Sequence, residues 1–411
     1  GDGGKIVVWS NITNENSLTD VSGATLQAVG GSEGGDGGKI ETSGKIVDLT
    51  DTIVLAGAPQ GANGLWLIDP DMTLGSGEIS SINAALSGNA NVEYFTSTGH
   101  LTLTDSIAIN KNGGGTATLT LKADGNVIIG SYVTIDAPSG VLNLNIWSDA
   151  DNDNDGAVFI KDNTSIRTNG GYIRVGGGNS LTSDYADNSG DIWQGVLIDQ
   201  SFLDAEGGDI SIRGSTDSSS EEWGVVIQNG ATVKTSASGN ITINGKSTSS
   251  GQNPYGVLLR STGSNIAAKN GVISITGSGL GAKNTRGIVL ENNSIISVSG
   301  SGAINIYGTA DSGVGLAMGN TSRIYNASGQ ITIATDTLSM DSDTRILSNG
   351  ASQAELTVKP TTSTRKTDIG VNYNGSLYLP ASYFSTNFQN GFKQITVGST
   401  SSARVNLNTV S

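Results

Sequence analysis

The stretch GVVIQNGATVKTSASGNITING at Gly224–Gly245 decides the fold, because GVLLRSTGSNIAAKNGVISITG at Gly256–Gly277 repeats its pattern. Each copy has a glycine, three apolar residues, a polar turn, a second short strand and a closing Ile-x-Ile. The unit recurs in steps of 29, 32, 31 and 28 residues, with its opening glycines at Gly195, Gly224, Gly256, Gly287 and Gly315. The closing strands keep the same register, with isoleucines at Ile210, Ile241, Ile273, Ile304 and Ile331. Because two independent markers share one register, we interpret this region as a structural repeat.

The repeat predicts an all-β fold. A unit of about 30 residues with three short strands is too short for a propeller blade, which needs about 40–45 residues. It is typical of one coil of a parallel β-helix (β-solenoid), in which coils stack about 4.8 Å apart and inward Ile, Val and Leu columns form one core. Glycines at the corners supply the positive φ angles of the bends. At about 30 residues per coil, the whole chain would make about thirteen or fourteen coils.

The repeat is not equally regular along the chain. We expect a parallel β-helix over residues 1–345, with looser coils at 1–190 and regular coils at 190–335. Residues 80–95 interrupt the glycine rhythm and predict a short helix or a lateral loop. Beyond residue 345 the pattern weakens and prolines appear, so we expect residues 346–411 to form a terminal β elaboration that continues or caps the helix.

Composition excludes several classes of protein. Glycine makes up 59 of the 411 residues, but no Gly-x-y period is present, which excludes collagen. The net charge is -15 and no basic cluster occurs, so the positive charge that nucleic-acid binding needs is missing. The absence of cysteine excludes disulfides and thiolate metal sites. No apolar stretch reaches the roughly 18 residues that a transmembrane helix needs.

Five segments spread over most of the chain carry a family resemblance. They are GDGGKIVVWSN, GGDGGKIETSGK, APQGANGLWLIDPDMTL, LNIWSDADNDNDGAVFI and FQNGFKQITVG, at Gly1–Asn11, Gly34–Lys45, Ala58–Leu74, Leu144–Ile160 and Phe388–Gly398. In this order they resemble the filamentous haemagglutinin-like exoproteins, adhesins that bacteria export by two-partner secretion, in the region downstream of the secretion domain. The resemblance implies a right-handed parallel β-helix that is secreted through an outer-membrane transporter and is extracellular or displayed on the bacterial cell surface. The Asn-Pro motifs of the secretion domain are not in this sequence, so export concerns the parent polypeptide.

The segment DADNDNDGAVFIKD at Asp149–Asp162 predicts a calcium site. Its D-x-D-x-D-G spacing and the acidic residue at position twelve follow the pattern that brings hard oxygens to one Ca²⁺ ion. The expected ligands are Asp151, Asp153, Asp155, the carbonyl of Ala157, and Asp162. A solvated acidic turn is the alternative interpretation, although these aspartates would repel one another without a cation.

Two further columns follow from the register of the repeat. Aromatic residues and an arginine precede the corner glycines, and we expect a stacked outer row that binds glycans or only stabilises the stack, made of Trp193, Trp223, Tyr255 and Arg286. Five residues after each glycine, a second column reads as an internal structural ladder of side-chain hydrogen bonds, made of Gln200, Asn229, Ser261, Asn292 and Asn320.

Catalysis is the main competitor to a binding role, because glycoside hydrolysis needs only two convergent carboxylates. The candidate carboxylates are Asp199, Asp204, Glu221 and Glu222. The single histidine, His100, has no supporting Ser-His-Asp motif, and we interpret it as a strand residue.

We therefore predict a non-enzymatic extracellular adhesin or surface-fibre segment. It would be a rigid β-helical stalk that presents loops to glycans or proteins of host or neighbouring cells, with Ca²⁺ as the one expected cofactor. The alternatives are a structural subunit that associates end to end into an extracellular filament, because strand edges pair readily with another chain, and a β-helical polysaccharide-active enzyme.

Overall fold

The computed structural model describes residues 1–70, 74–188, 194–217, 223–251, 253–281, 283–348, 353–389, 391–398 and 404–407. It confirms the predicted fold class, because the chain is nearly all β and its coils stack in parallel. The β-solenoid has about 11 turns of roughly 29 residues. There are fewer turns than the thirteen or fourteen expected, because a helix and a terminal segment use chain without adding coils. The chain forms two compact units, residues 1–186 with 201–208, and residues 187–200 with 209–411.

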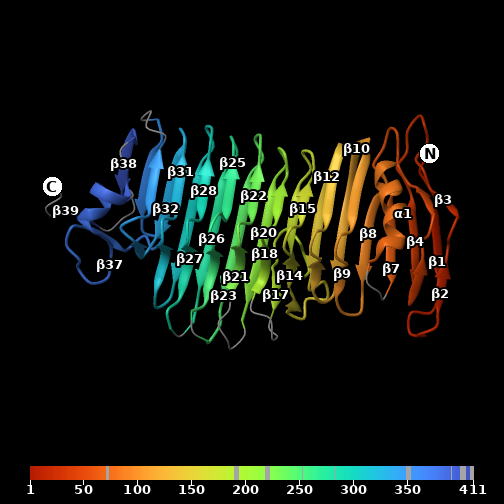
Figure 1. Ribbon diagram of the computed structural model, residues 1–411, viewed down its shortest axis with the longest axis horizontal. Coiled ribbons are helices and arrows are strands. Elements are labelled where there is room, and N and C mark those ends of the chain that lie inside the picture. The colour runs from red at the N-terminus through yellow and green to blue at the C-terminus, as the bar shows by residue number, and fades with distance from the viewer. Residues whose placement is uncertain are drawn as a thin grey trace. The chain divides into compact units, whose positions relative to one another are not determined.

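In its described residues, the first unit consists of parallel strands in successive coils and one helix (Figure 1). Its elements are β1 (Lys5–Trp9), β2 (Leu18–Asp20), β3 (Thr25–Gln27), β4 (Lys39–Gly44), β5 (Ile46–Asp48), β6 (Ile53–Leu55), β7 (Leu65–Pro70), α1 (Ser76–Ser87), β8 (Asn91–Thr96), β9 (Leu101–Leu103), β10 (Ala108–Ala123), β11 (Val127–Ile129), β12 (Thr134–Ser148), β13 (Asp155–Gly156), β14 (Val158–Ile160), β15 (Ser165–Arg167), β16 (Ile173–Gly177) and β19 (Phe202–Asp204). Strand β17 (Ala186–Asn188) contains the boundary between the units. The strand registers align one inward column, made of Ile6, Ile40, Trp66, Val92, Leu119 and Leu144.

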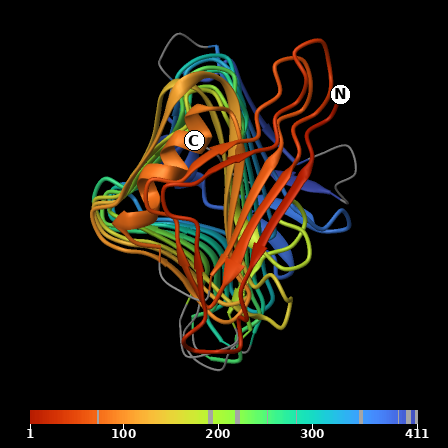
Figure 2. The same cartoon turned by 90° about the vertical axis from the view of Figure 1, so that its right-hand side faces the viewer.

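Helix α1 overlaps residues 80–95, where the sequence predicts a helix or a lateral loop, but it begins four residues earlier, at Ser76. It begins at Ser76, where the Gly75 N–H donates to Glu78 Oε2 at 3.1 Å, and it ends at Ser87. Its apolar face, Ile79, Ile82, Ala85 and Leu86, is buried, which is the spacing of an amphipathic helix. Figure 2 shows the helix in orange beside the strands of the early coils.

Lys111 of β10 closes the C-terminal end of α1. Its side chain is fully buried. The Nζ group donates to the Leu86 carbonyl at 3.1 Å, to Asn89 Oδ1 at 3.0 Å and to the Gly113 carbonyl at 3.1 Å. All three ammonium N–H groups are therefore satisfied by uncharged oxygens, and the charge lies where the helix dipole favours a cation. Burial lowers the pKa of Lys111.

The second unit contains the regular coils. Its elements are β18 (Gln194–Asp199), β20 (Ile210–Thr216), β21 (Trp223–Gln228), β22 (Thr232–Thr235), β23 (Ile241–Ser247), β24 (Tyr255–Leu259), β25 (Asn265–Ala268), β26 (Ile273–Gly279), β27 (Arg286–Leu290), β28 (Ile295–Val298), β29 (Ile304–Ala310), β30 (Val314–Met318), β31 (Arg323–Asn326), β32 (Gln330–Thr335), β33 (Leu338–Met340), β34 (Arg345–Ser348), β35 (Glu355–Lys359), β36 (Lys366–Ile369), β37 (Ser376–Leu379), the π-helical turn η1 (Tyr383–Asn387), β38 (Gln394–Val397) and β39 (Val405–Leu407). From β21 to β35 each coil has three strands, as predicted. The predicted closing isoleucines align from coil to coil and are fully buried at Ile241, Ile273, Ile304 and Ile331.

The predicted internal ladder lies outside the core. Its members all have positive φ, at Gln200, Asn229, Ser261, Asn292 and Asn320. Four of these residues are exposed and Ser261 is half-buried, so the column forms turns at the surface. Asparagine suits this position because it tolerates the left-handed conformation. Within the column, Asn320 Nδ2 donates to Asn292 Oδ1 at 2.9 Å.

A column of buried hydroxyl groups, and not the predicted column, forms the repeated side-chain hydrogen bonds inside the solenoid. Ser264, Ser294, Ser322 and Thr344 follow the turn in successive coils and are fully buried. Each hydroxyl donates to a backbone carbonyl three or four residues earlier at 2.6–2.9 Å. Each of these buried hydroxyl groups therefore has a hydrogen-bond partner at its own corner.

The last coils end in a cap built from the segment around η1. Tyr383 Oη accepts a hydrogen bond from the Met340 N–H at 2.9 Å and donates to the Leu338 carbonyl at 3.4 Å. Asn387 Nδ2 donates to the carbonyls of Asp341 and Thr344 at 2.7 and 2.9 Å. Together with a bridge between Ile346 and Phe388, these contacts satisfy the edges of β33 and β34.

Candidate functional site

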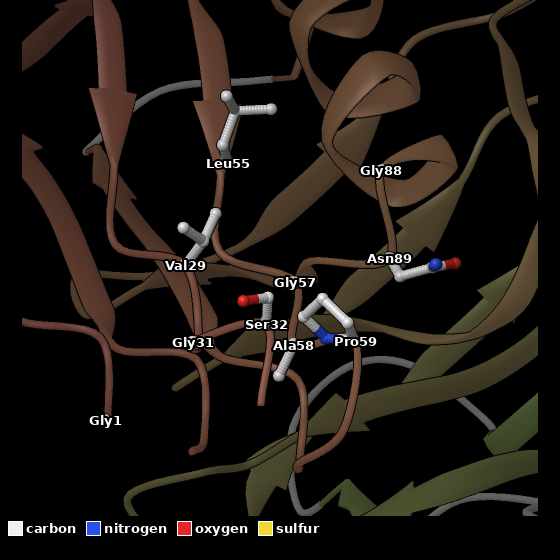
Figure 3. A pocket seen from close by; sticks show the side chains of 11 residues that line it. Gly1, Val29, Gly31, Ser32, Leu55, Gly57, Ala58, Pro59, Gly88 and Asn89 are labelled. Atoms are coloured by element: carbon white, nitrogen blue, oxygen red, sulfur yellow. The ribbon is translucent and has the colours of Figure 1, made fainter. Parts of the chain in front are cut away.

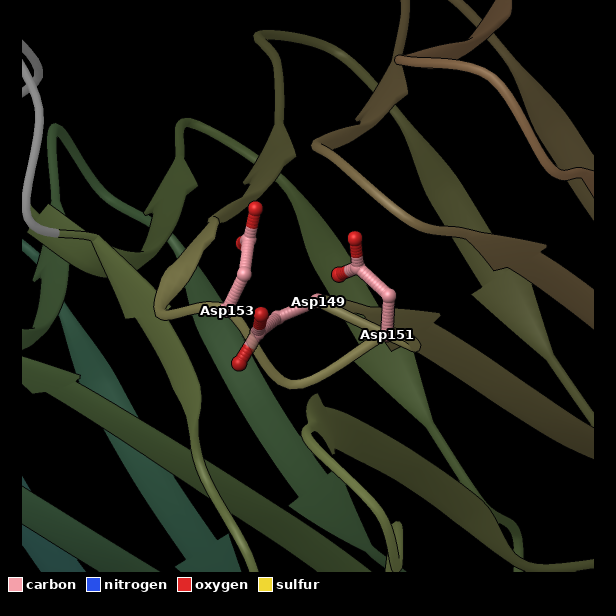
Figure 4. Close-up of side chains that lie close together, drawn as sticks. All are labelled: Asp149, Asp151 and Asp153. Atoms are coloured by element: carbon pink, nitrogen blue, oxygen red, sulfur yellow. The ribbon is translucent and has the colours of Figure 1, made fainter.

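The loop after β12 gathers three carboxylates. Asp149 is buried, whereas Asp151 and Asp153 are exposed, and their carboxylate oxygens lie within 4.8 Å of one another (Figure 4). Asp149 and Asn152 have positive φ angles of 49° and 59°, which turn the chain back on itself. The Asn154 N–H then donates to Asp149 Oδ1 at 3.0 Å.

Asp151 and Asp153 of the predicted calcium ligands are brought together, but the other three are not part of this cluster. The backbone N–H of Asp155 donates to Asp153 Oδ1 at 3.0 Å. The Ala157 carbonyl accepts a strand hydrogen bond from the Val127 N–H at 2.9 Å. Strand β14 separates these residues from Asp162, as the AVFI sequence suggests.

Asp162 is engaged in another contact. Its carboxylate accepts hydrogen bonds from Ser131 Oγ at 2.5 Å and from Asn163 Nδ2 at 3.0 Å, and the Ser131 bond lowers the pKa of Asp162. The residue that the spacing missed is Asp149, which joins the cluster because of its positive φ. Three carboxylates supply part of the six to eight oxygens that Ca²⁺ takes. The calcium site stays a prediction.

A fourth carboxyl group borders this loop. Burial raises the pKa of Asp124, and the charges of Asp151 and Asp153 raise it further against the opposing charge of Lys122. The Lys122 ammonium is held 4.6 Å from the ring centroids of both Phe95 and Trp147, a cation–π arrangement. Asp124, which retains its proton to higher pH, therefore borders the two exposed carboxylates of the loop.

The outer row of the second unit is stacked in the predicted register. Trp223 pairs with Tyr255 and Tyr255 with Arg286, while Trp193 lies outside the described residues. The rings of Trp223 and Tyr255 stack with centroids 6.3 Å apart, and the Arg286 guanidinium carbon lies 5.3 Å from the Tyr255 centroid. Only 9% of Trp223 is exposed, because it packs with Val226, Leu258 and Val289 of the same outer face. The accessible part of the row is therefore its half-buried end, Tyr255 and Arg286.

A groove of about 180 Å³ adjoins Arg286. Its polar lining includes Arg286, Glu291, Asn320, Ser339 and Asp341. The Asp341 carboxylate accepts a hydrogen bond from the Asn320 N–H at 3.3 Å. Sequence reasoning missed Glu291 and Asp341. The register could have found Glu291, because the position one residue before the asparagine column holds a charged residue in several coils, at Asp199, Arg260 and Glu291.

Where the structure describes them, the candidate catalytic carboxylates accept hydrogen bonds at turns. Asp199 Oδ1 accepts from Asn229 Nδ2 at 2.7 Å, and Asp204 Oδ1 accepts from the Glu206 N–H at 2.8 Å. His100 lies directly before β9 and not within a strand, and its Nδ1 accepts a hydrogen bond from the Asn126 N–H at 2.9 Å. Glu221 and Glu222 lie outside the described residues.

A larger cavity of about 750 Å³ lies beside the first two coils and the end of α1 (Figure 3). Its walls are mainly small and apolar, with Val29, Leu55, Ala58 and Pro59 among the lining residues. Val29 and Leu55 are 38% and 36% exposed. Among the described residues, the lining is formed by glycines and by side chains that do not titrate.

Comparison with known proteins gives no match to a family model, a curated protein or a solved structure. Among the residues that the structure describes, no helix is both long and apolar enough to cross a lipid bilayer.

Proposed function

We propose that this protein is a non-enzymatic, extracellular adhesin or surface-fibre segment, a β-helical stalk that holds attachment surfaces on its outer face. The alignment of fully buried aliphatic residues in successive coils carries the proposal. A repeat array gains its stability from contacts between neighbouring coils, so such columns make a cooperative scaffold. Exposed polar and charged groups lie in turns and grooves on the outside of this scaffold.

The groove beside Arg286 is the attachment surface that we favour. It offers a guanidinium, two carboxylates, an amide and a hydroxyl group, and the guanidinium carbon lies 5.3 Å from the Tyr255 ring centroid. Several hydrogen-bonding groups that converge in one small groove suit the hydroxyl groups of a sugar. A cell-surface glycan is therefore the proposed ligand class.

Binding of the purified chain to a glycan array and to intact cells tests this proposal. Arg286→Ala and Asp341→Asn should each weaken binding about tenfold, corresponding to about 1.4 kcal/mol. Arg323→Ala is the matched control, because Arg323 is exposed on β31 and does not line the groove. Absence of glycan and cell binding, or an equal loss in the control, would contradict the assignment.

The stalk role has its own test in limited proteolysis. Cleavage should be confined to surface loops, and the coils from β21 to β35 should remain in one resistant fragment, because local opening of a buried stack is costly. Rapid cleavage within the buried strands would contradict a rigid scaffold.

An enzyme acting on polysaccharide is the competing function, and Asp124 is the observation that favours it. Carboxyl groups with separated pKa values can serve as acid and base, and Asp124 has a raised pKa beside Asp151 and Asp153. A screen for depolymerised polysaccharide decides between the two functions. Turnover that is lost in Asp124→Asn but kept in Asp343→Asn, an exposed aspartate elsewhere, would replace the adhesin proposal.

A further inference from the structure

The groove beside Arg286 opens where the outer row of large side chains ends. In register, the row passes from large residues to a small one, in the order Trp223, Tyr255, Arg286 and Val314. Two apolar residues that are aligned in neighbouring coils, Val289 and Ala317, also line the groove. The groove therefore combines apolar contact with the charged and polar groups described above.

A second hollow, of about 410 Å³, adjoins this groove at Asn320, which lines both. It lies over the turns that follow β24, β27 and β30, and we call it the turn hollow. Its lining includes hydroxyl and amide groups from all three turns, at Ser261, Thr262, Asn292, Asn293, Asn320 and Thr321. The strands before these turns are aligned at Leu259, Leu290 and Met318, so the same turn positions recur from coil to coil.

The turn hollow has a fixed backbone and free side-chain groups. Asn320 Nδ2 donates to Asn292 Oδ1 at 2.9 Å, and the Asn293 N–H donates to the Asn320 carbonyl at 2.8 Å. Within the described chain, the side-chain amide of Asn293 and the hydroxyl of Thr262 make no hydrogen bond. These two groups can therefore bond to a ligand without losing a protein partner.

The spacing of the turns suits a ligand with a repeating unit. Neighbouring coils of a parallel stack are about 4.8 Å apart, which is close to the advance of one pyranose ring along an extended glycan. Successive turns can therefore offer their amide and hydroxyl groups to successive sugar units. A single sugar fills the groove beside Arg286 but does not reach across the three turns.

Charge favours a neutral glycan over an acidic one. The groove lining has one guanidinium, from Arg286, and two carboxylates, from Glu291 and Asp341. The whole chain carries a net charge of -15. A polyanionic glycan would be repelled by this excess of negative charge, whereas a neutral one is unaffected.

We propose that the ligand is a neutral linear oligosaccharide that binds with one unit in the groove beside Arg286 and the following units in the turn hollow. Its path leads past Asn320 toward Thr262. The proposal rests on the glycan-binding function proposed above, to which it adds the length and the charge class of the ligand.

Titration calorimetry with sugars of increasing length tests the proposal. The probes are cello-, malto- and chito-oligosaccharides, each from the monosaccharide to the hexasaccharide, with oligogalacturonides as the acidic series. In the neutral series that binds best, affinity should rise about tenfold from the monosaccharide to the tetrasaccharide, because the longer ligand gains hydrogen bonds in the turn hollow. The oligogalacturonides should bind more weakly at every length.

Asn293→Gly separates the turn hollow from the groove. Glycine keeps the positive φ of 62° but removes the amide, so the gain with length should be lost while monosaccharide binding stays unchanged, which also shows that the variant is folded. Arg286→Ala should instead weaken binding of every length. Asn229→Gly is the matched control, because Asn229 also has a positive φ, of 56°, but lines neither the groove nor the turn hollow.

The outcomes distinguish this inference from the function on which it rests. A hexasaccharide that binds no better than its monosaccharide would overturn the extended site and leave glycan binding in place. Tighter binding of the oligogalacturonides, or a gain with length that survives Asn293→Gly, would also overturn it. Failure of every sugar to bind, both here and on the glycan array, would contradict the proposed function and this inference together.

Discussion

The first and the last coils of the described chain differ in how their strand edges are covered. At β1 the inward residues Ile6 and Val8 are half-buried, and no side chain is placed over them in the described chain. At β33 and β34 the Tyr383 hydroxyl and the Asn387 amide satisfy the strand edges. The difference shows that a few local side chains are enough to satisfy the strand edges of β33 and β34.

This comparison implies that stability differs along the chain. A residue between two coils has neighbours above and below, whereas a residue of the first coil has them on one side. Removing side-chain volume should therefore destabilise the middle of the stack far more than its open end.

The largest effect is expected for Ile304→Ala. Ile304 is fully buried between Ile273 and Ile331, and its truncation should lower the free energy of unfolding by about 3 kcal/mol. Ile6→Ala is the matched substitution at the open end and should cost less than about 1 kcal/mol, because Ile6 is already half-solvated. Urea unfolding followed by circular dichroism measures both. Equal losses would show that the first coil is as well packed as the interior.

Asn387→Ala should weaken the cap next most strongly. The buried amide donates to two carbonyls and to Thr344 Oγ1, so its removal deletes these buried hydrogen bonds at a cost of about 1–3 kcal/mol. Hydrogen exchange should accelerate in residues 341–348 and stay unchanged in β4 and β7. Ser385→Ala, an exposed change in the same turn, is the control. Unchanged exchange in 341–348 would mean that the cap does not hold this edge.

Tyr383 makes the closed end sensitive to alkaline pH. Burial raises the pKa of its hydroxyl group, so the folded state holds this proton more tightly than the unfolded state. The stabilisation is complete below the ordinary pKa of about 10 and is lost as the pH rises toward the raised value. At neutral pH Tyr383→Phe should cost about 1 kcal/mol through the lost hydrogen bond to Met340. Above pH 10 the variant should lose less stability than the wild type, and parallel pH curves would contradict this account.

The smallest effect is expected for Trp9→Phe at the open end. Trp9 Nε1 donates to Glu41 Oε1 at 2.9 Å, but the side chain is 66% exposed. An exposed hydrogen bond competes with water, so thermal unfolding should change by less than about 0.5 kcal/mol. A loss above 1 kcal/mol would show that Trp9 is part of a cap that its exposure conceals.

The regular coils could be predicted from sequence because two markers constrain each unit. A glycine and a closing isoleucine recur together and fix both the length of a coil and the face of its strands, which is why Ile241 and Ile273 lie as expected. The prediction that these glycines form the corners is wrong, because they lie inside strands without a positive φ, as Gly224 does in β21. The same register predicted the contact between Trp223 and Tyr255. It could not predict that Trp223 is covered, since burial depends on the apolar residues of neighbouring coils.

Turns were less predictable, because the same residue type serves opposite roles there. An asparagine that recurs once per coil, such as Asn292, could form a hydrogen-bonded ladder inside the solenoid or a turn on its surface. The sequence pattern is the same in both cases, and the positive φ of these residues shows that they form surface turns. The acidic loop shows a similar limit. Its spacing predicted Asp155 and Asp162 as metal ligands. Instead, β14 separates Asp162 from the loop, and Asp149, which has a positive φ, is the third member of the cluster.

The buried contact of Lys111 has a consequence for behaviour in salt water. Ion pairs at the surface, such as that of Lys45 with the exposed Glu15, weaken as dissolved ions screen them. The Lys111 ammonium is instead held by two backbone carbonyls and an amide oxygen, out of reach of mobile ions. The attachment of α1 to β10 should therefore be equally strong in fresh water and in brine.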